Sequence, residues 1–404
     1  MMKQQQMLLH PEEKTILDAG FAAAFGGTPE RYFSAPGRTE IGGNHTDHQR
    51  GRVLAGAVDL DTRAAVRCNG TREIRILSQG YPLCVVDLST LTPVAEEMNS
   101  TPALIRGVAA RFSQLGCKVQ GFDAYVQSTV LPGSGLSSSA AFEVLVGTII
   151  NSLFFDGKAT QPEIAMIGQY AENVFFGKPC GLMDQMASAV GGMITIDFGK
   201  KDAPEIRSVE FDFASCGHAL CIIDSGADHA DLTDEYAAVT RDFGALCAHF
   251  GKEVLTEVAE EDFYAAIPAL RVSCGDRAVM RGIHEYEENK RVTQQVAALT
   301  GGDFDRFLEL IKESGYSSYM YLQNVIPAGY VQHQDMAVAL GLCQHYLQGR
   351  GAFRVHGGGF AGTVQAFVPL DMLEDFRAGI DGALGQGACH VLTIRPRGGV
   401  EMEI

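Results

Sequence analysis

The chain has 404 residues, of which 46% are hydrophobic and 20% are charged, which is the composition of a folded protein and not of a disordered one. Its length leaves room for two or three domains with a substantial core. The formal net charge is −17 and no basic run occurs anywhere. Such a surface repels phosphate backbones and anionic lipids, so nucleic acid and membranes are excluded as expected partners.

The N-terminal stretch MMKQQQMLLHPEEK lacks the apolar core of a signal peptide. No apolar run approaches the roughly 18 residues that a membrane-spanning helix requires. The ten cysteines are scattered singly, without a C-x-x-C pair, which excludes the common zinc spacings and fits a reducing compartment. The sequence therefore predicts a cytoplasmic protein.

The first half of the chain predicts strands followed by helices. Short apolar, β-branched runs between Val53 and Leu88 are spaced as antiparallel strands would be. The stretch STPALIRGVAARFSQLG, which ends at Gly116, has apolar residues at helical spacing. A strand is predicted at Phe122–Val130, then a buried helix over SAAFEVLVGTIINSLFF. A further helix is predicted from about Pro162, a favoured first-turn proline, to Phe176.

The character of the sequence changes at residues 199–205, a Gly/Lys/Asp/Pro stretch that predicts a boundary between domains 1–203 and 204–404. Strands are predicted beyond it in HALCIIDSG, AFRVHGGG, TVQAFVP and HVLTIRP. Helices are predicted near residues 233–250, 277–298, 304–314 and 336–347. Because the helices are too clustered for regular βαβ winding, the pattern favours an α+β protein of two domains.

Residues 131–141, LPGSGLSSSAA, lie between a predicted strand and a predicted helix. The serines then occupy the first turn of the helix, where unpaired N–H groups and the helix dipole favour a phosphate. Gly133 and Gly135 would let the backbone approach that phosphate closely. The alternative is a turn of small residues that only caps the helix.

This serine loop is not a Walker loop, because no Gly-Lys-Ser/Thr follows, and Ser138 occupies the third glycine position of a dinucleotide fingerprint. With no lysine in the loop, the charge of a phosphate must be neutralised from elsewhere. The interpretation is Mg²⁺ held by a serine hydroxyl and a carboxylate.

Three other stretches carry chemistry. Residues 36–51, PGRTEIGGNHTDHQRG, crowd several hydrogen-bonding types into a glycine-rich segment whose polarity predicts a loop. In GLMDQ, residues 181–185, Asp184 is the only charge in an apolar neighbourhood, and a buried aspartate without a partner is costly. Asp184 is therefore expected to be ion-paired or functional. Residues 356–362, HGGGFAG, form a second glycine-rich loop between two strands.

In this order the four stretches resemble the GHMP kinase superfamily and, within it, the galactokinases. The serine loop resembles the phosphate-binding motif of the superfamily, and HGGGFAG resembles its C-terminal glycine motif. GRTEIGGNHTDHQRG resembles the galactokinase sugar-binding stretch G-R-x-N-x-I-G-E-H-T-D-Y-x-x-G. CGLMDQ resembles the catalytic-aspartate segment, and DSGADHADLTDEY, residues 224–236, a following sugar-contact segment. The resemblance extends from Phe33 to Pro369.

The resemblance implies a ribosomal-S5-like N-terminal domain with the serine loop and a ferredoxin-like C-terminal domain with the glycine motif. Sugar and ATP would meet in the cleft between them. The implied activity is ATP-dependent phosphorylation of the anomeric hydroxyl of galactose, which gives galactose 1-phosphate and ADP.

The resemblance also implies roles for residues. Asp184 would accept or orient the hydroxyl proton, and Arg38 would keep Asp184 ionised and stabilise the transferring phosphoryl group. Glu172 would hold Mg²⁺ with Ser139 or its neighbour Ser138. The implied ATP-binding residues are Gly133, Ser134, Gly135, Leu136, Ser137, Ser138 and Ser139. The implied sugar-binding residues are Asn44, His45, Thr46, Asp47 and Tyr236.

Two departures from the pattern leave the sugar open: Asn44 replaces a glutamate and His48 replaces a tyrosine. Asparagine removes the repulsion of a sugar carboxylate and adds an N–H donor, which suits galacturonate. The segment DHQ also resembles galacturonate kinases, whereas the net charge of −17 disfavours a second anionic substrate. Galactose is the first expectation and galacturonate the alternative.

A non-catalytic sugar sensor is the alternative from another class of function. Such proteins have an altered serine loop, whereas GLSSSAA, Asp184 and Arg38 are all present here, which favours an enzyme.

Overall fold

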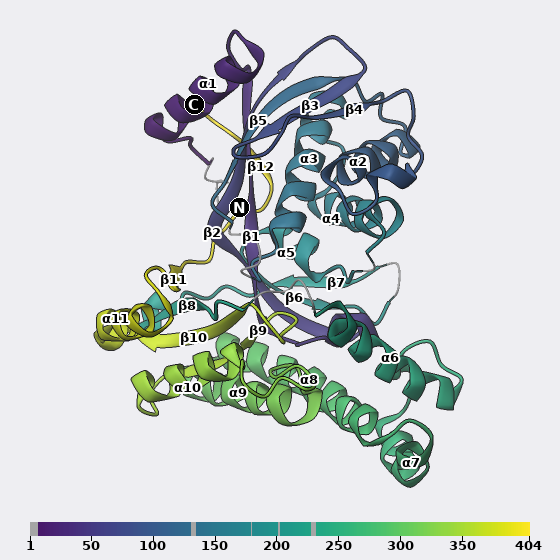
Figure 1. Cartoon of the computed structure of the whole chain (residues 1–404), viewed down its shortest axis with the longest axis vertical. Helices are drawn as coiled ribbons and strands as arrows, with labels where there is room; N and C mark the ends of the chain where they lie inside the picture. Colours follow the sequence, from purple (N-terminus) through teal and green to yellow (C-terminus); the bar gives the residue numbers. More distant parts are fainter. Residues whose placement is uncertain (1–6, 131–134, 179, 201–202, 228–231) are drawn as a thin grey trace.

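Two β-sheets with helices packed on them organise this computed structural model (Figure 1). It describes residues 7–130, 135–178, 180–200, 203–227 and 232–404. Among these residues the larger sheet has the strand order β12-β1-β2-β5-β3-β4, with β6 paired to β2 and β7 to β6. Its strands are β1 (Arg31–Gly42), β2 (Arg52–Cys68), β3 (Glu73–Ser78), β4 (Cys84–Asp87), β5 (Phe122–Ser128), β6 (Met193–Asp197), β7 (Glu205–Ser208) and β12 (Val400–Met402).

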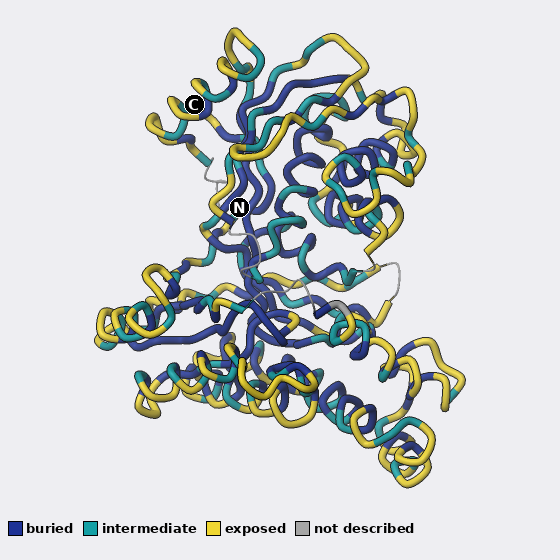
Figure 2. Tube along the Cα trace, viewed as in Figure 1, coloured by how far each residue is buried: buried dark blue, intermediate teal, exposed yellow. Residues whose placement is uncertain are grey.

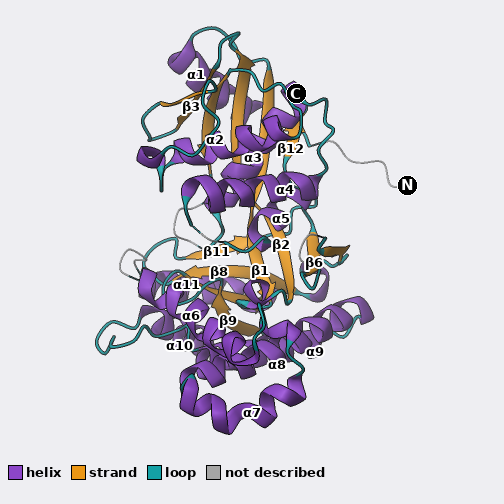
Figure 3. Ribbon diagram, turned by 90° about the vertical axis from the view of Figure 1, so that its right-hand side faces the viewer, coloured by secondary structure: helices purple, strands orange, loops and turns teal. Residues whose placement is uncertain are grey.

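Alternation along the strands gives the larger sheet two apolar faces. Phe33, Ala64 and Val66 point into a core with the helices on one face, whereas Tyr32 and Ala65 point to a smaller cluster beneath α1 on the other. Figure 1 shows α1 and the helices α2 to α5 on opposite sides of the larger sheet, and Figure 3 looks onto the face that α2, α3 and α4 cover. The first face is covered by α2 (Thr101–Gln114), α3 (Ser138–Phe154), α4 (Gln161–Tyr170), the π-helical turn η3 (Ala171–Phe176) and α5 (Met183–Val190), and the second by α1 (Pro11–Phe25).

The smaller sheet is antiparallel, in the order β11-β8-β10-β9. Leu220 and Ile222 of β8 point toward α8 and α9, whereas Cys221 and Ile223 point toward α10 and α11. Helices α6 and α7 pack against α8. The elements are β8 (His218–Asp224), α6 (Thr233–Phe250), α7 (Glu260–Ser273), α8 (Asp276–Gly301), α9 (Phe304–Ser317), α10 (Asp335–Leu347), β9 (Ala352–His356), β10 (Thr363–Pro369), α11 (Leu373–Leu384) and β11 (Cys389–Leu392).

One apolar core joins the two sheets. Ile41 and Leu54, near the adjacent ends of β1 and β2, share it with Leu136 of the serine loop, Val292 of α8 and Ile222 of β8. Figure 2 shows buried chain running without interruption from the larger sheet into the smaller. The serine loop and the sugar-binding segment are therefore fixed against the second half of the chain.

The α+β class and most elements expected after residue 100 are confirmed. The expectation that residues 36–51 form a loop is wrong, because β1 continues to Gly42 and only the remainder, with a 3₁₀ turn at Thr46–Gln49, is irregular. The boundary after residue 203 stays a prediction. Strands β7 and β12, which follow that boundary in sequence, pair within the larger sheet.

Within the described part of the chain, no helix combines the length and the apolar character that a bilayer crossing demands.

Candidate active site

Arg38 and Asp184 form a two-pronged ion pair at the junction of the two sheets. Arg38 lies on β1, and Asp184 lies in the first turn of α5. The Nε of Arg38 donates to Oδ1 of Asp184 at 2.6 Å, and Nη2 donates to Oδ2 at 2.8 Å. The hydroxyl of Ser137 donates to the same Oδ2 at 2.6 Å. The ion pair that the sequence predicts is therefore present, with a third partner that it did not predict.

The environment of Asp184 keeps its carboxylate charged. Burial by itself would raise the pKa of Asp184, but the Arg38 guanidinium and the Ser137 hydroxyl hold that pKa below its usual value. The side chain of Asp184 is still 31% exposed, whereas that of Arg38 is 8% exposed. An ionised acid is thus open to a ligand on one side and anchored on the other.

The serine loop leads directly into α3. Gly133 and Ser134 lie outside the described residues, while Gly135 to Ser139 lie within them. Ser137 has φ +60° and α3 begins at Ser138. A Cβ added at Gly135, where φ is +69°, would lie 2.7 Å from Oγ1 of Thr363. Only glycine fits there, because the loop approaches the smaller sheet closely.

Arg38 also holds this loop through its backbone. The N–H of Arg38 donates to the carbonyl of Leu136 at 3.0 Å, and its Nη1 donates to the carbonyl of Gly135. One residue therefore fixes both Asp184 and the segment that precedes α3.

Two buried carboxylates share one amide behind Asp184. The Nε2 of Gln185 donates to Glu172 at 2.9 Å and to Glu143 at 3.0 Å. Burial raises the pKa of Glu172 and raises that of Glu143 well above its usual value. Lys178, a largely exposed residue, lies 3.7 Å from Glu172. Sequence reasoning missed Glu143, although an acid inside the apolar helix α3 was a visible signal.

These carboxylates bear on the expected Mg²⁺. Among the described residues, no three His, Cys, Asp or Glu side chains group as a metal site. Mg²⁺ commonly takes only one or two carboxylates and completes its shell with water and phosphate oxygens. Glu172 is an oxygen donor next to Gln185, and Oε1 of Glu143 is buried without a hydrogen-bond partner. The residues present fit a cation in this place.

Two of the expected sugar-binding residues face the protein interior. The hydroxyl of Thr46 is buried and donates to the carbonyls of Gly43 and Arg52. The amide of Asn44, which is 1% exposed, donates to Glu40 and to the carbonyl of Gly357. Neither side chain opens onto the cleft in the structure.

Two others contact the carbonyls of the HGGGFAG stretch. The Nε2–H of His45 donates to the carbonyl of Gly358 at 3.0 Å, and the hydroxyl of Tyr236 donates to that of Gly359 at 2.7 Å. Burial lowers the pKa of His45 to about 3, assisted by the charge of His48, so His45 is neutral. Burial raises the pKa of Tyr236 to about 12, so its hydroxyl keeps its proton.

Asp47 lies against the segment that carries Asp184. A Cβ at Gly181 would lie 1.8 Å from Oδ2 of Asp47, so any larger residue there would displace the Asp47 carboxylate. Oδ1 of Asp47 accepts the N–H of His48 at 2.9 Å. Behind them Glu285 is buried with Oε2 unpartnered, and burial together with the charge of Asp47 raises its pKa well above its usual value. Asp47 of the first motif therefore lies beside Gly181, three residues before Asp184 in the chain.

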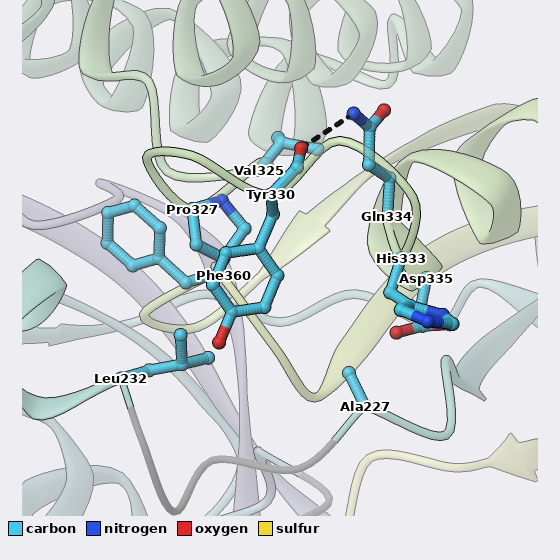
Figure 4. Close-up of a pocket in the computed structure, with 9 residues that line it drawn as sticks. All are labelled: Ala227, Leu232, Val325, Pro327, Tyr330, His333, Gln334, Asp335 and Phe360. Atoms are coloured by element: carbon cyan, nitrogen blue, oxygen red, sulfur yellow. Dashed lines mark hydrogen bonds between the residues drawn. The ribbon is translucent and has the colours of Figure 1, made fainter.

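A separate pocket of about 170 Å³ borders Phe360 of the glycine stretch (Figure 4). Arg38, Asp47 and Asp184 do not line it. Phe360 packs edge-on against Tyr236 at 5.4 Å between ring centroids, and a hydrogen bond from Gln334 to the carbonyl of Tyr330 crosses the other side. The described pocket is thus adjacent to the candidate site and distinct from its charged centre.

Comparison with known families agrees with this geometry. Residues 19–68 match the galactokinase galactose-binding signature, and residues 103–192 match the GHMP kinases N-terminal domain. The first match contains Arg38 and Asp47, and the second contains the serine loop, Glu172 and Asp184.

Solved structures share the fold over nearly the whole chain. Lactococcus lactis galactokinase complexed with galactose is 24% identical, with 96% of this chain and 99% of that chain covered and a TM-score of 0.81. Mevalonate kinase of L. major is 16% identical, with 92% and 99% covered and a TM-score of 0.60. A D-glycero-D-manno-heptose 1-phosphate kinase from Bacteriodes thetaiotaomicron is 15% identical, with 93% and 99% covered and a TM-score of 0.64. Two segments of the chain therefore match models of the GHMP kinases and of the galactokinases, and its fold matches those of the solved kinases named above.

Proposed function

We propose that this protein transfers the γ-phosphoryl group of ATP to the anomeric hydroxyl of galactose. The observation that carries the proposal is the ion pair of Arg38, inside the galactose-binding signature, with Asp184, which also accepts from Ser137 just before α3. Phosphoryl transfer depends mostly on positioning and charge stabilisation, and this arrangement offers both.

Asp184 accepts or orients the proton of the attacking hydroxyl. Its lowered pKa keeps it ionised, and its exposed fraction leaves one side open to the sugar. Arg38 remains charged and stabilises negative charge that develops on the transferring group. The same guanidinium also donates to the carbonyl of Gly135. It therefore holds Asp184 and the serine loop at a fixed distance from each other.

The N–H groups from Gly133 to Ser139 cradle the phosphates at the N-terminal end of α3. Glu172 and the hydroxyl of Ser139, or of its neighbour Ser138, hold Mg²⁺. When bound, Mg²⁺ would offset the charge of the phosphates, which the lysine-free loop does not. The buried Gln185 keeps Glu172 beside the catalytic segment.

Asp47 is the main acceptor for sugar hydroxyls, with His45 and Tyr236 at the edge of the pocket. One of the two arguments for galacturonate, beside the resemblance of the DHQ segment, was an Asn44 amide that faces the sugar. Since that amide is buried against Glu40 and Gly357, this support for a carboxylated sugar is lost and galactose is favoured.

The test is ADP release with ATP, Mg²⁺ and a panel of hexoses that includes galactose, galacturonate and 2-deoxygalactose. We expect the highest kcat/KM for galactose. A tenfold higher value for another sugar, about 1.4 kcal/mol in transition-state binding, would overturn the choice of galactose. Galactose binding without ADP release from any hexose would instead support a sensor and overturn the enzyme.

A further inference from the structure

The glycine loop, defined here as Gly357 to Gly359, has each of its three carbonyls bound by a side chain. Asn44 donates to Gly357 at 2.5 Å, and Tyr236 donates to Gly359 at 2.7 Å. The carbonyl of Gly358 accepts from His45 at 3.0 Å and from Nδ2 of Asn324 at 3.2 Å. In a planar trans peptide the C=O and N–H point in opposite directions, so these bonds also fix where the loop presents its amide hydrogens.

The amide of Asn44 can lie in only one orientation. Its Nδ2 side faces two acceptors, the carbonyl of Gly357 and Oε1 of Glu40 at 3.0 Å. Its Oδ1 side faces two donors, Nδ2 of Asn324 at 2.7 Å and the hydroxyl of Ser318 at 3.2 Å. All four bonding directions of the amide are used within the protein, so none is left for a sugar.

Glu40 is held in turn by Arg354, which lies on β9, the strand that leads directly into the glycine loop. Their side chains are 3% and 0% exposed, and Nη2 of Arg354 donates to the same Oε1 that accepts from Asn44. Arg354 also donates from Nη1 to the carbonyl of Ile41 at 2.8 Å. The buried charge of Glu40 is therefore compensated, and its oxygen orients the amide of Asn44.

The two positions carry exchanged residues relative to the galactokinase stretch. In G-R-x-N-x-I-G-E the fourth position is asparagine and the eighth is glutamate, whereas this chain has Glu40 and Asn44. An ionised acid at position 44 has no hydrogen to donate to Gly357. With Glu40 and Asn44, positions 40 and 44 together still carry one carboxylate. The amide at position 44 adds a hydrogen bond from the sugar-binding segment to the glycine loop.

We propose that Asn44 is a positioning residue, oriented by Glu40 and Arg354, which holds the glycine loop in its productive place and does not contact the sugar. The inference rests on the proposed sugar-kinase function. It explains why the position that deviates most in the sugar-binding stretch is completely buried.

Isosteric variants test this assignment. Asn44→Asp removes the donor to Gly357 and adds a second carboxylate beside Glu40. Glu40→Gln/Asn44→Asp moves the acid from position 40 to position 44, so the pair again holds one carboxylate while Gly357 still lacks its donor. Ser318→Ala is the matched control, because it removes one bond to Asn44 and leaves the bond to Gly357 intact.

We expect Asn44→Asp to lower both Tm and kcat, the latter by at least about tenfold, with the KM for the sugar changed less than about threefold. In the double variant the Tm recovers but kcat stays low. Ser318→Ala keeps kcat within about twofold of the wild type. If kcat recovers together with Tm in the double variant, Asn44 only supports the fold and the proposal is wrong. A tenfold rise in sugar KM with kcat retained would show a direct sugar contact and would also overturn it.

A readout without turnover separates this proposal from the proposed function. Hydrogen exchange of the peptide that spans residues 357–362 should become faster in Asn44→Asp and in the double variant, and not in Ser318→Ala. If hydrogen exchange is unchanged in both variants that carry the Asn44→Asp substitution, the positioning role of Asn44 is wrong, even if the wild type phosphorylates galactose. If hydrogen exchange is faster in these variants but the wild type phosphorylates no hexose, the positioning role of Asn44 is supported and only the kinase assignment is rejected.

Discussion

The Arg38–Asp184 pair and the proposed sugar-binding segment relate differently to their sequence motifs. Arg38 and Asp184 form an ion pair, and one side of the Asp184 carboxylate is exposed. In residues 44–47, by contrast, Asn44 and Thr46 turn inward and only His45 and Asp47 remain partly open. A motif thus predicts where the reactive residues lie, but some of its side chains hold the motif in place and do not face a ligand.

Removal of Mg²⁺ should separate the two regions most sharply. In excess chelator we expect turnover to fall by at least about a thousandfold, since a bound metal is worth several kcal/mol of charge stabilisation. Galactose binding, measured by calorimetry, should persist, because the sugar-binding segment contributes no proposed metal ligand. Ser139→Ala should raise the Mg²⁺ concentration needed for half-maximal activity. Full activity in chelator contradicts the metal assignment.

Asp184→Asn and Arg38→Ala should each lower kcat by at least about a hundredfold, because both act on charge that develops in the transition state. Equilibrium binding of sugar and nucleotide should survive. Asp197→Asn is the control, since it breaks the exposed pair of Asp197 with Arg52, at 2.8 Å, outside the site. Near-normal turnover in a site variant removes that residue from the mechanism.

Asp47→Asn should raise the KM for galactose by at least about tenfold with a smaller effect on kcat, because a site built to accept hydroxyl hydrogens loses an anionic acceptor. Thr46→Val should show the opposite pattern. It loses the buried hydroxyl hydrogen that the carbonyls of Gly43 and Arg52 share, so the free energy of unfolding should fall by about 1–3 kcal/mol while KM stays unchanged. Steady-state kinetics and urea unfolding of both variants measure these effects. Equal changes in KM would contradict the different roles of Asp47 and Thr46.

Glu285→Gln gives the smallest expected effect, on stability alone. Because the folded-state pKa of Glu285 is raised, the acid contributes stability below its unfolded pKa and loses it as pH rises toward the folded value. The glutamine variant avoids this loss. Its unfolding free energy relative to wild type should therefore increase with pH from about 4.5 upward, by up to about 1.4 kcal/mol per unit. Denaturant titrations at pH 5 and pH 7 measure it, and a pH-independent difference would show that Glu285 is ionised.

Local pattern and the resemblance were enough to predict the motif stretches, most helices and the Arg38–Asp184 pair. The end of β1 was not predictable from polarity, because Arg38, Thr39 and Glu40 are buried yet satisfied by partners from distant segments. The orientation of Asn44 was hidden for the same reason: apart from Glu40, the side-chain amide's partners lie 274 to 313 residues further along the chain. Sequence reveals which hydrogen-bonding groups exist, but their pairing is decided by the fold.

Strand β12 has a consequence for how the protein is made. It pairs with β1, where Ser34 lies opposite Val400, and Arg395 donates to Ser34 at 2.7 Å and to Asp61 at 2.9 Å. At about 5–20 residues per second, a ribosome needs roughly 20 to 70 seconds between completing β1 and delivering β12. Throughout that interval the nascent β1 offers an unpaired edge to other chains. Translation speed and chaperone access should therefore affect the soluble yield of this protein.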